Sequence, residues 1–337
     1  MDYIVAMQRA IALSEKGLGK CAPNPIVGAV IIDATGKVIA EGFHDRMSSG
    51  DHAEVVAVKS AGDLAKGATM VVTLEPCSHV GNTGPCTEAI IAAGISTVVF
   101  AVSDPNAVAS GGADVLRAAG IKVIDGVMAK EASYANRAWL TKIKKNRPFF
   151  IWKVATTLDA KIAACDGTSK WISNETSRSD VQRLRRESDA ILVGTNTVVV
   201  DNPNLIPRGE FSGYTHNPIR VICGEQELPS DSNIFDDSAA TILVKSKDLK
   251  VLVEKLNELH INQVFVEAGP TLGSAMVGAG LIDELVIYQA PSLLGSGKPF
   301  FALESQSTIE DQLRMDHVST EVLAGDIKSI YRIGAGV

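Results

Sequence analysis

One stretch of the sequence carries residue types that could hold a catalytic metal ion, and it runs from His52 to Cys86. His52 offers an imidazole, and Cys77 and Cys86 offer two thiolates. A structural zinc site normally has four protein ligands, whereas a catalytic site has three and leaves the fourth position to water. Zinc lowers the pKa of that water to about 7, so hydroxide forms at neutral pH. We expect Glu54, two residues after His52, to carry protons rather than to bind the metal.

Two other interpretations of this stretch stay open from the residue types. His79 lies between the two cysteines and could compete as a ligand. Unpaired cysteines are also common as small buried core residues, and Cys77 and Cys86 would then bind no metal. The order of His-x-Glu, a β-rich run over 70–74 and Pro-Cys favours the metal site over this second alternative.

Helices and strands that alternate along the first half of the chain must position these residues. Helical spacing of apolar residues predicts a first helix that ends near Gly17 and another that begins at His52. A hairpin is predicted over 27–41. Later segments predict strands over 70–74, 97–102 and 122–124, and helices over 87–93, 113–119 and 130–143. This alternation predicts an α/β layered sheet, with metal ligands at helix N-termini beside strand ends.

A basic segment with a proline, residues 144–148, indicates a linker, so we predict two domains, 1–146 and 147–337. The helix predicted over 176–186 contains four arginines, and one that faced inward could bind a phosphate bidentately. The strand–turn–helix segment around 264–274 is rich in small residues, which suits backbone binding of a phosphate or pyrophosphate. It is not the G-x-G-x-x-G dinucleotide motif. The other strands predicted in this half are 149–155, 190–194, 219–223, 242–244, 285–289, 314–322 and 327–333.

Composition narrows the class of protein. The chain has 337 residues, enough for two domains, and a formal net charge of −7, which argues against a nucleic-acid partner and for a small-molecule substrate. Five cysteines, two of them needed as thiolates, indicate a reducing cytoplasm. The N-terminal segment lacks the charge order of a secretory signal, and no apolar run is long enough to span a bilayer.

His52-Ala53-Glu54 and Pro76-Cys77 resemble the metal-binding motifs of zinc deaminases that act on nucleobases. Over essentially its full length the chain resembles the bifunctional deaminase–reductases of riboflavin biosynthesis, and the long loop between the cysteines is a trait of that family. The resemblance implies an α/β fold, with a cytidine-deaminase-like three-layer domain followed by a dihydrofolate-reductase-like α/β domain. The motifs that carry it are 23–30, 52–54, 73–79, 84–86, 158–159, 171–172, 201–203 and 266–272.

The resemblance also implies two successive reactions on one pyrimidine ribotide. Zinc-bound hydroxide would deaminate 2,5-diamino-6-ribosylamino-4(3H)-pyrimidinone 5′-phosphate, with Glu54 moving the proton to ammonia, and NADPH would then reduce the ribosyl to a ribityl side chain. The cofactors expected are Zn²⁺ and NADPH, and we expect a homo-oligomer. The alternative is a single-activity deaminase whose C-terminal half binds a nucleotide or mediates oligomerisation.

Matching positions give a candidate for each role. The implied zinc ligands are His52, Cys77 and Cys86, and the implied catalytic residue is Glu54. The implied substrate-binding residues are Asn24 and His79 in the first site, and Lys153, Ser169, Arg185, Leu205, Arg208 and Glu267 in the second. The implied cofactor-binding residues are Ala155, Trp171, Thr197, Asp201, Gly269, Pro270, Thr271, Leu272, Gly273, Ser274 and Ala275.

The chain departs from the family pattern at three places. Asn82 stands where the family commonly has Lys or Arg, which removes one expected phosphate contact from the deaminase site. Ala160 replaces the glycine of Leu-Asp-Gly, and Ile206-Pro207 replaces Thr-Val before Arg208. The last two changes are expected to narrow the reductase pocket.

Overall fold

The structure is a computed structural model that describes residues 3–48, 50–79, 84–106, 110–213, 216–302 and 307–334. Asn82 lies outside these ranges. Contacts within the chain divide it into two compact units, Met1–Asn146 and Arg147–Val337. Among the helices of the described ranges, none is both long enough and apolar enough to cross a membrane.

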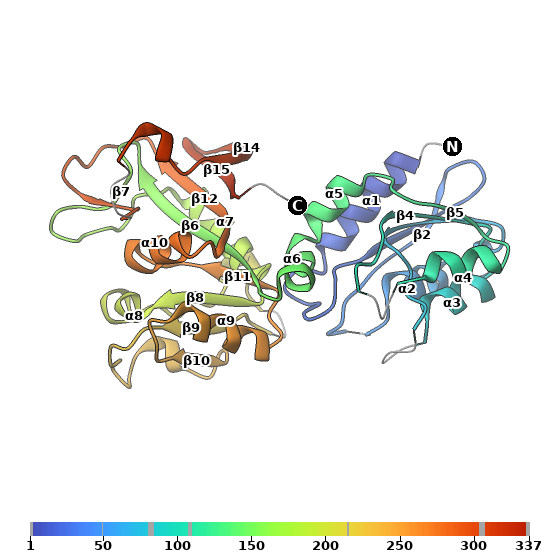
Figure 1. Cartoon of the computed structure of the whole chain (residues 1–337), viewed down its shortest axis with the longest axis horizontal. Helices are drawn as coiled ribbons and strands as arrows, with labels where there is room; N and C mark the ends of the chain where they lie inside the picture. The colour runs from blue at the N-terminus through green and yellow to red at the C-terminus, as the bar shows by residue number, and fades with distance from the viewer. Residues whose placement is uncertain are drawn as a thin grey trace. The chain divides into compact units, whose positions relative to one another are not determined.

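Unit 1 is built on a five-stranded sheet (Figure 1). Its strands are β1 (Gly28–Ile32), β2 (Val38–Phe43), β3 (Thr69–Leu74), β4 (Thr97–Val102) and β5 (Lys122–Ile124). Their order is β2-β1-β3-β4-β5, in which β1 pairs antiparallel with both β2 and β3, and β3, β4 and β5 run parallel. β1 and β3 are buried along their whole length, because helices cover both faces of the sheet.

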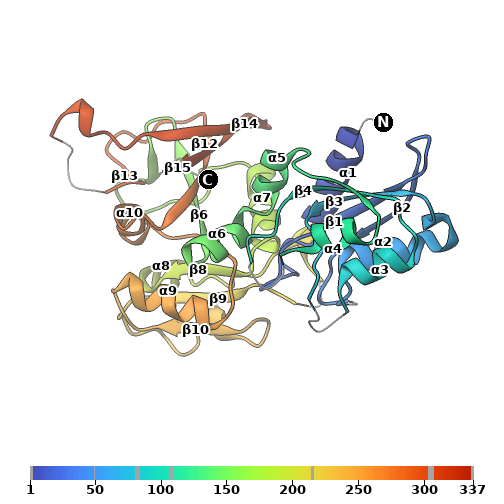
Figure 2. The ribbon, with the colours of Figure 1, turned by 45° about the vertical axis from the view of Figure 1, so that its right-hand side comes forward.

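The helices of unit 1 are α1 (Tyr3–Glu15), α2 (Ala53–Ala61), α3 (Cys86–Ala92), α4 (Gly112–Ala118), α5 (Ala129–Ala135) and α6 (Arg137–Lys145). Figure 2 shows α1 on one side of the sheet and α2 and α3 on the other. Met7 and Ala10 of α1 pack with Val71 on one face of the sheet. Ala57 of α2 packs with Val72 in the core on the other face. The predicted three-layer arrangement is confirmed.

The single helix predicted over 130–143 is wrong, because Asn136 divides it into α5 and α6. Asn136 has φ −95° and ψ 18°, outside the usual helical values. Its side-chain oxygen accepts the backbone N–H of Ile26, 110 positions away in the chain, at 3.2 Å. A long-range hydrogen bond therefore accompanies a break that the hydrophobic period does not indicate.

Unit 2 is built on an eight-stranded sheet of β6 (Phe149–Thr157), β8 (Ala190–Gly194), β9 (Ile219–Cys223), β10 (Thr241–Val244), β11 (Gln263–Val266), β12 (Ile282–Ala290), β14 (Met315–Leu323) and β15 (Asp326–Ile333). Their order is β10-β9-β8-β11-β6-β12-β15-β14, and only the last two pairings are antiparallel (Figure 1). A small separate sheet joins β7 (Lys161–Ala163) to β13 (Lys298–Pro299). The helices are α7 (Glu175–Arg186), α8 (Thr195–Asp201), α9 (Leu249–Glu258) and α10 (Pro270–Gly278).

A glycine allows α10 to pack closely on the central strand β6. A Cβ atom at Gly273 would lie 2.1 Å from Cζ2 of Trp152, whose side chain is buried in the core. The Trp152 indole N–H donates to the carbonyl of Ala268 at 3.1 Å, just before the helix begins. The indole thus fixes the N-terminal end of α10 against the sheet.

Candidate functional site

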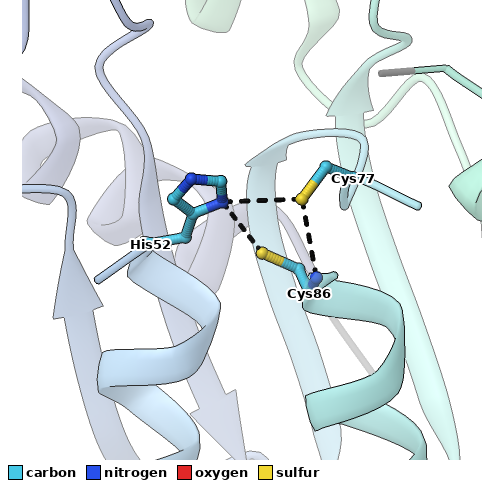
Figure 3. A group of neighbouring side chains, drawn as sticks. All are labelled: His52, Cys77 and Cys86. Atoms are coloured by element: carbon cyan, nitrogen blue, oxygen red, sulfur yellow. Dashed lines mark hydrogen bonds between the residues drawn. The ribbon is translucent and has the colours of Figure 1, made fainter. Parts of the chain in front are cut away.

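Three donor atoms meet where two helices of unit 1 begin. His52 is the N-cap residue of α2, Cys86 is the first residue of α3, and Cys77 lies in the loop after β3. His52 Nδ1 lies 3.1 Å from Cys86 Sγ and 3.5 Å from Cys77 Sγ, and all three donor atoms lie within 4.8 Å of one another. Figure 3 shows the three side chains pointing toward one common place.

These residues fit a divalent zinc ion. Zinc–ligand bonds of about 2.0–2.3 Å in a tetrahedral arrangement place the donor atoms about 3.5–3.8 Å apart, close to the separations seen here. The Cys86 thiol and the His52 ring donate hydrogen bonds to Cys77 and lower the pKa of Cys77 to about 4, whereas the same contact raises the pKa of Cys86. Zinc binding displaces the protons of its thiol ligands, so two neighbouring thiols beside an imidazole suit this cation. His79 does not belong to this donor group within the described ranges.

Glu54 lies in the first turn of α2 and is buried beside the donor group. Burial raises the pKa of its carboxyl group, while the nearby His52 lowers it. The carboxyl group interacts with the side chains of His52, Cys77 and Cys86, so it lies at the donor group. A buried carboxyl group that neighbours the donors suits the proton carrier predicted from the sequence.

A cavity of about 640 Å³ opens onto the donor group, and both predicted substrate-binding residues of the first site line it. The Asn24 side-chain amide lies 3.2 Å from Nε2 of His44, and the two residues share one wall. The Nδ1 atom of His79 is buried and has no hydrogen-bond partner among the described residues. An unsatisfied buried ring nitrogen is costly, so a bound molecule that pairs with it gains affinity.

The sequence interpretation missed several residues that line this cavity. His44 is buried, and its ring lies edge-on to that of His52, with centroids 5.3 Å apart. Asp104 and Asn106, which follow the end of β4, also line the cavity. The position of Asp104-Pro105-Asn106 directly after a predicted strand was a usable signal, because strand ends collect functional residues in α/β folds.

Glu75 joins two parts of the cavity wall. It directly precedes Pro76-Cys77, and its two carboxylate oxygens accept the backbone N–H groups of Asp104 at 3.1 Å and Ala113 at 3.0 Å. The start of α4 also packs tightly on this loop, since a Cβ atom at Gly112 would lie 1.8 Å from the Pro76 carbonyl oxygen. The loop that carries Cys77 is thus held by the loop after β4.

In unit 2, Lys153, Arg185 and Glu267 form one charged cluster. Lys153 comes from β6, Glu267 follows β11, and Arg185 lies in the last turn of α7. Arg185 donates through Nε and Nη2 to the two carboxylate oxygens of Glu267, at 2.5 and 2.9 Å. Burial raises the pKa of Glu267, but Arg185 and Lys153 outweigh it and hold that pKa below its usual value. The inward-facing arginine therefore binds a carboxylate of the protein.

Arg208 completes the positive charge around this cluster. It also lowers the pKa of Glu267, and its backbone N–H donates to the side chain of Gln182 at 3.2 Å. Leu205 is buried with φ +62°, so the chain turns sharply between α8 and Arg208. Burial lowers the pKa of Lys153, and Glu267 partly restores it. Arg185, Lys153 and Arg208 therefore all act on the carboxylate of Glu267.

The predicted cofactor loop, residues 269–275, forms the start of α10 beside the carboxyl end of β11. Gly269 is the N-cap residue and Pro270 the first helical residue, so the next backbone N–H groups have no partner within the helix. A Cβ atom at Gly269 would meet nothing within 4 Å, which leaves space for a ligand phosphate there. These residues fit the pyrophosphate of a dinucleotide.

The other predicted residues of the second site lie on neighbouring elements. Ala155 lies two positions after Lys153 on β6, and Thr197 and Asp201 lie on α8, directly after β8. Ser169 and Trp171 lie in the exposed segment between β7 and α7. Trp171 is 69% exposed and stacks with Arg178, whose Cζ lies 4.6 Å from the ring centroid. The ends of β6, β8 and β11 therefore carry most of this second group.

Of the departures in the sequence, Ala160 has a clear conformational meaning. Its φ of +60° lies in the left-handed region, which glycine adopts without strain and alanine does not. The turn thus keeps its left-handed backbone conformation, which costs more free energy with alanine than with glycine.

Two family models match the chain. The cytidine and deoxycytidylate deaminase zinc-binding region matches residues 2–102, and the RibD C-terminal domain matches residues 148–329. They confirm the predicted deaminase-like domain followed by a reductase domain, with zinc and NADPH as the cofactors.

Relatives match nearly the whole chain. The riboflavin biosynthesis protein RibD of Mycobacterium tuberculosis is 42% identical, over 96% of this chain and 95% of its own length. RibD of Escherichia coli is 40% identical, over 86% and 88%. A Thermotoga maritima structure described as a diaminohydroxyphosphoribosylaminopyrimidine deaminase/5-amino-6-(5-phosphoribosylamino)uracil reductase has a TM-score of 0.90 and 35% identity, and covers 98% of this chain and 99% of that one.

Three observations point to the same family. They are the order of the two matched domains, the nearly full-length match to relatives, and the convergence of the His and Cys donors. The alternative of a deaminase with an unrelated C-terminal module is not favoured, because the second family model covers most of unit 2. The chain belongs to the RibD family, whose members are bifunctional enzymes of riboflavin biosynthesis that combine a deaminase with a reductase.

Proposed function

We propose that unit 1 deaminates diaminohydroxyphosphoribosylaminopyrimidine and that unit 2 reduces 5-amino-6-(5-phosphoribosylamino)uracil, the reactions named for the Thermotoga maritima protein. The observation that carries the proposal is the convergence of His52, Cys77 and Cys86 at a cavity that also contains Glu54. We assign these three residues as zinc ligands. A binding module would need neither a three-donor group nor a buried carboxyl group beside it.

In the deamination, each residue of the chain has a defined task. Bound zinc supplies a Lewis acid that lowers the pKa of water. Glu54 takes a proton from that water and passes it to the departing amine, since its carboxyl group is buried beside the donors. Asn24 and His79 bind the pyrimidine from the cavity wall, where His79 has a ring nitrogen available for hydrogen bonding. Burial of the Glu54 side chain limits its contact with bulk water.

In the reduction, the chain binds and orients two molecules. NADPH supplies the hydride, and we assign its binding to Ala155, Trp171, Thr197, Asp201 and the loop 269–275. The substrate is held by Lys153, Ser169, Leu205, Arg208 and Glu267. Arg208 is the better candidate for the phosphate than Arg185, because Arg185 already uses two of its donor atoms on Glu267. Arg185 then acts by orienting the Glu267 carboxylate toward the substrate.

Three further proposals concern the protein's surroundings. None of the five cysteines, all of which the structure describes, forms a disulfide, which supports a reducing, cytoplasmic location. The net charge of −7 supports a small-molecule substrate and no nucleic-acid partner. We also propose that the enzyme is a homo-oligomer, which sedimentation of the purified chain tests.

A metal assay combined with two activity measurements tests the function. Purified full chain should contain about one zinc per chain, release ammonia from the ribotide, and then oxidise NADPH with the deaminated product. Glu54→Gln should keep its zinc and lose ammonia release by 100-fold or more, while NADPH oxidation continues, because general acid–base catalysis contributes about 10²–10⁴-fold. Undiminished ammonia release by this variant would refute the assigned role of Glu54. Ammonia release without NADPH oxidation would instead restrict the chain to the first activity.

A further inference from the structure

The charges around the unit 1 cavity are unevenly distributed. Three acidic side chains line it, Glu54, Glu75 and Asp104. Among the described residues that line it, Arg46 is the single side chain with a permanent positive charge. The histidines cannot replace it at neutral pH without taking up a proton. A substrate that carries a phosphate dianion therefore has one fixed cation to pair with in this lining.

Arg46 is held at the cavity by a contact that leaves most of its guanidinium available. Its Nη1 donates to the carbonyl oxygen of Ala22 at 2.9 Å, and the residue is otherwise exposed. A guanidinium has five N–H donors, and the bond to Ala22 uses one of them. Ala22 precedes Pro23-Asn24, so the anchor keeps Arg46 on the same wall as the proposed substrate contact Asn24.

The two short segments that follow His79 and Asn106 in the sequence contain neither Lys nor Arg. Residues 80–83, outside the described ranges, read Val-Gly-Asn-Thr and contain neither Lys nor Arg. Residues 107–109, also outside those ranges, read Ala-Val-Ala. Among the described residues of the lining, Arg46 is therefore the fixed cation that a ribotide phosphate can pair with.

We infer that Arg46 binds the 5′-phosphate of the deaminase substrate and so selects ribotides over the unphosphorylated nucleosides. This inference rests on the proposed deamination reaction. The planar guanidinium can donate two parallel N–H bonds to phosphate oxygens, and such charge-assisted bonds are stronger than those between neutral groups. The pyrimidine ring then lies toward Glu54, at the donor group, and the sugar spans the cavity between them.

The test compares Arg46→Gln and Arg46→Lys with wild-type enzyme and with Arg117→Gln as the matched control. Arg117 is an arginine of unit 1 on α4 that pairs with Asp114 and is not part of the cavity lining. Steady-state ammonia release from the ribotide gives KM and kcat for each protein. Ribose 5-phosphate and free ribose serve as competing probes, and zinc content and the unfolding temperature check that each variant folds.

Arg46→Gln should raise KM for the ribotide about 10- to 100-fold and leave kcat within about twofold, because a charge-assisted phosphate contact acts on binding. Inhibition by ribose 5-phosphate should weaken by the same factor, and Arg46→Lys should recover part of both. An Arg46→Gln enzyme with unchanged KM and unchanged inhibition by ribose 5-phosphate overturns the inference, as does a loss confined to kcat. A wild-type enzyme that releases no ammonia from the ribotide overturns the proposed function instead.

Discussion

Substituting alanine for Gly273 should destabilise unit 2 by forcing α10 away from the sheet. The added Cβ atom would lie 2.1, 2.3 and 2.8 Å from three atoms of the Trp152 indole. Carbon atoms in contact lie about 3.5–4.0 Å apart, so the helix and the ring must separate by about 1.4 Å. The indole cannot rotate away easily, because it is buried and its N–H donates to the Ala268 carbonyl at 3.1 Å.

The expected loss of stability lies at the upper end of the range that is typical of overpacked cores. Such substitutions typically cost about 1–3 kcal/mol, and here three indole atoms are affected at once, so we expect about 3 kcal/mol. For a unit of this size, about 2–4 °C of unfolding temperature corresponds to 1 kcal/mol, which gives a decrease of about 6–12 °C. The shift of α10 should also raise KM for NADPH, because the predicted cofactor loop begins this helix.

Calorimetry of the full chain measures the first effect, and NADPH titration of the reductase activity measures the second. Gly269→Ala is the matched control, because its Cβ atom would meet nothing within 4 Å. It should change stability by about 1 kcal/mol or less, the usual cost of alanine at a helix N-cap, yet it should still weaken NADPH binding. If Gly273→Ala unfolds within about 2 °C of wild type, the proposed close packing of α10 on Trp152 is wrong.

Three further outcomes follow from the structure. Arg185→Met should lower the free energy of unfolding in urea by about 3–5 kcal/mol, because Glu267 is left buried without its partner. Adding Glu267→Gln should restore most of that free energy, and a double variant no more stable than the single one would contradict this. Burial raises the pKa of Asp189 to about 6, so the folded state binds this proton more tightly and the free energy of unfolding should fall by up to about 3 kcal/mol as pH rises from about 4 to 6. Asp189→Asn should remove that pH dependence, and a variant with the wild-type pH profile would contradict the role of Asp189. In a metal assay, Cys86→Ser should lose most of its zinc, whereas the control Cys165→Ser, at an exposed cysteine outside the donor group, should keep it. Equal zinc contents in the two variants would exclude Cys86 as a ligand.

The order of apolar runs was sufficient to predict the layered fold of unit 1, because β1 and β3 are short, mostly apolar strands that alternate with helical segments. The break at Asn136 was not predictable in this way, since its accepted hydrogen bond comes from Ile26, far away in the sequence. The metal donors were predictable from residue type and order. Their convergence also needs α3 to begin at Cys86, which a motif alone does not fix.

The arginines of α7 show where residue type stops being informative. The sequence indicates that an inward-facing arginine would bind an anion, and Arg185 does so. The anion is Glu267, which lies 82 positions later and reaches the helix because α7 leads into β8, which pairs with β11 in the sheet. His44 was missed for a similar reason, because it follows β2, which joins the rest of the sheet through β1 and its long-range pairing with β3. Asp104 was missed although its position after a predicted strand was a usable signal.

The carboxylate of Glu75 has a consequence for local opening of the protein. Its two oxygens hold the amides of Asp104 and Ala113, and the same residue directly precedes the turn that carries Cys77. Those two amides should therefore exchange with deuterium at similar rates, because a single excursion of one side chain releases both. The wall of the cavity and the sulfur-bearing turn would then loosen together as one cooperative segment.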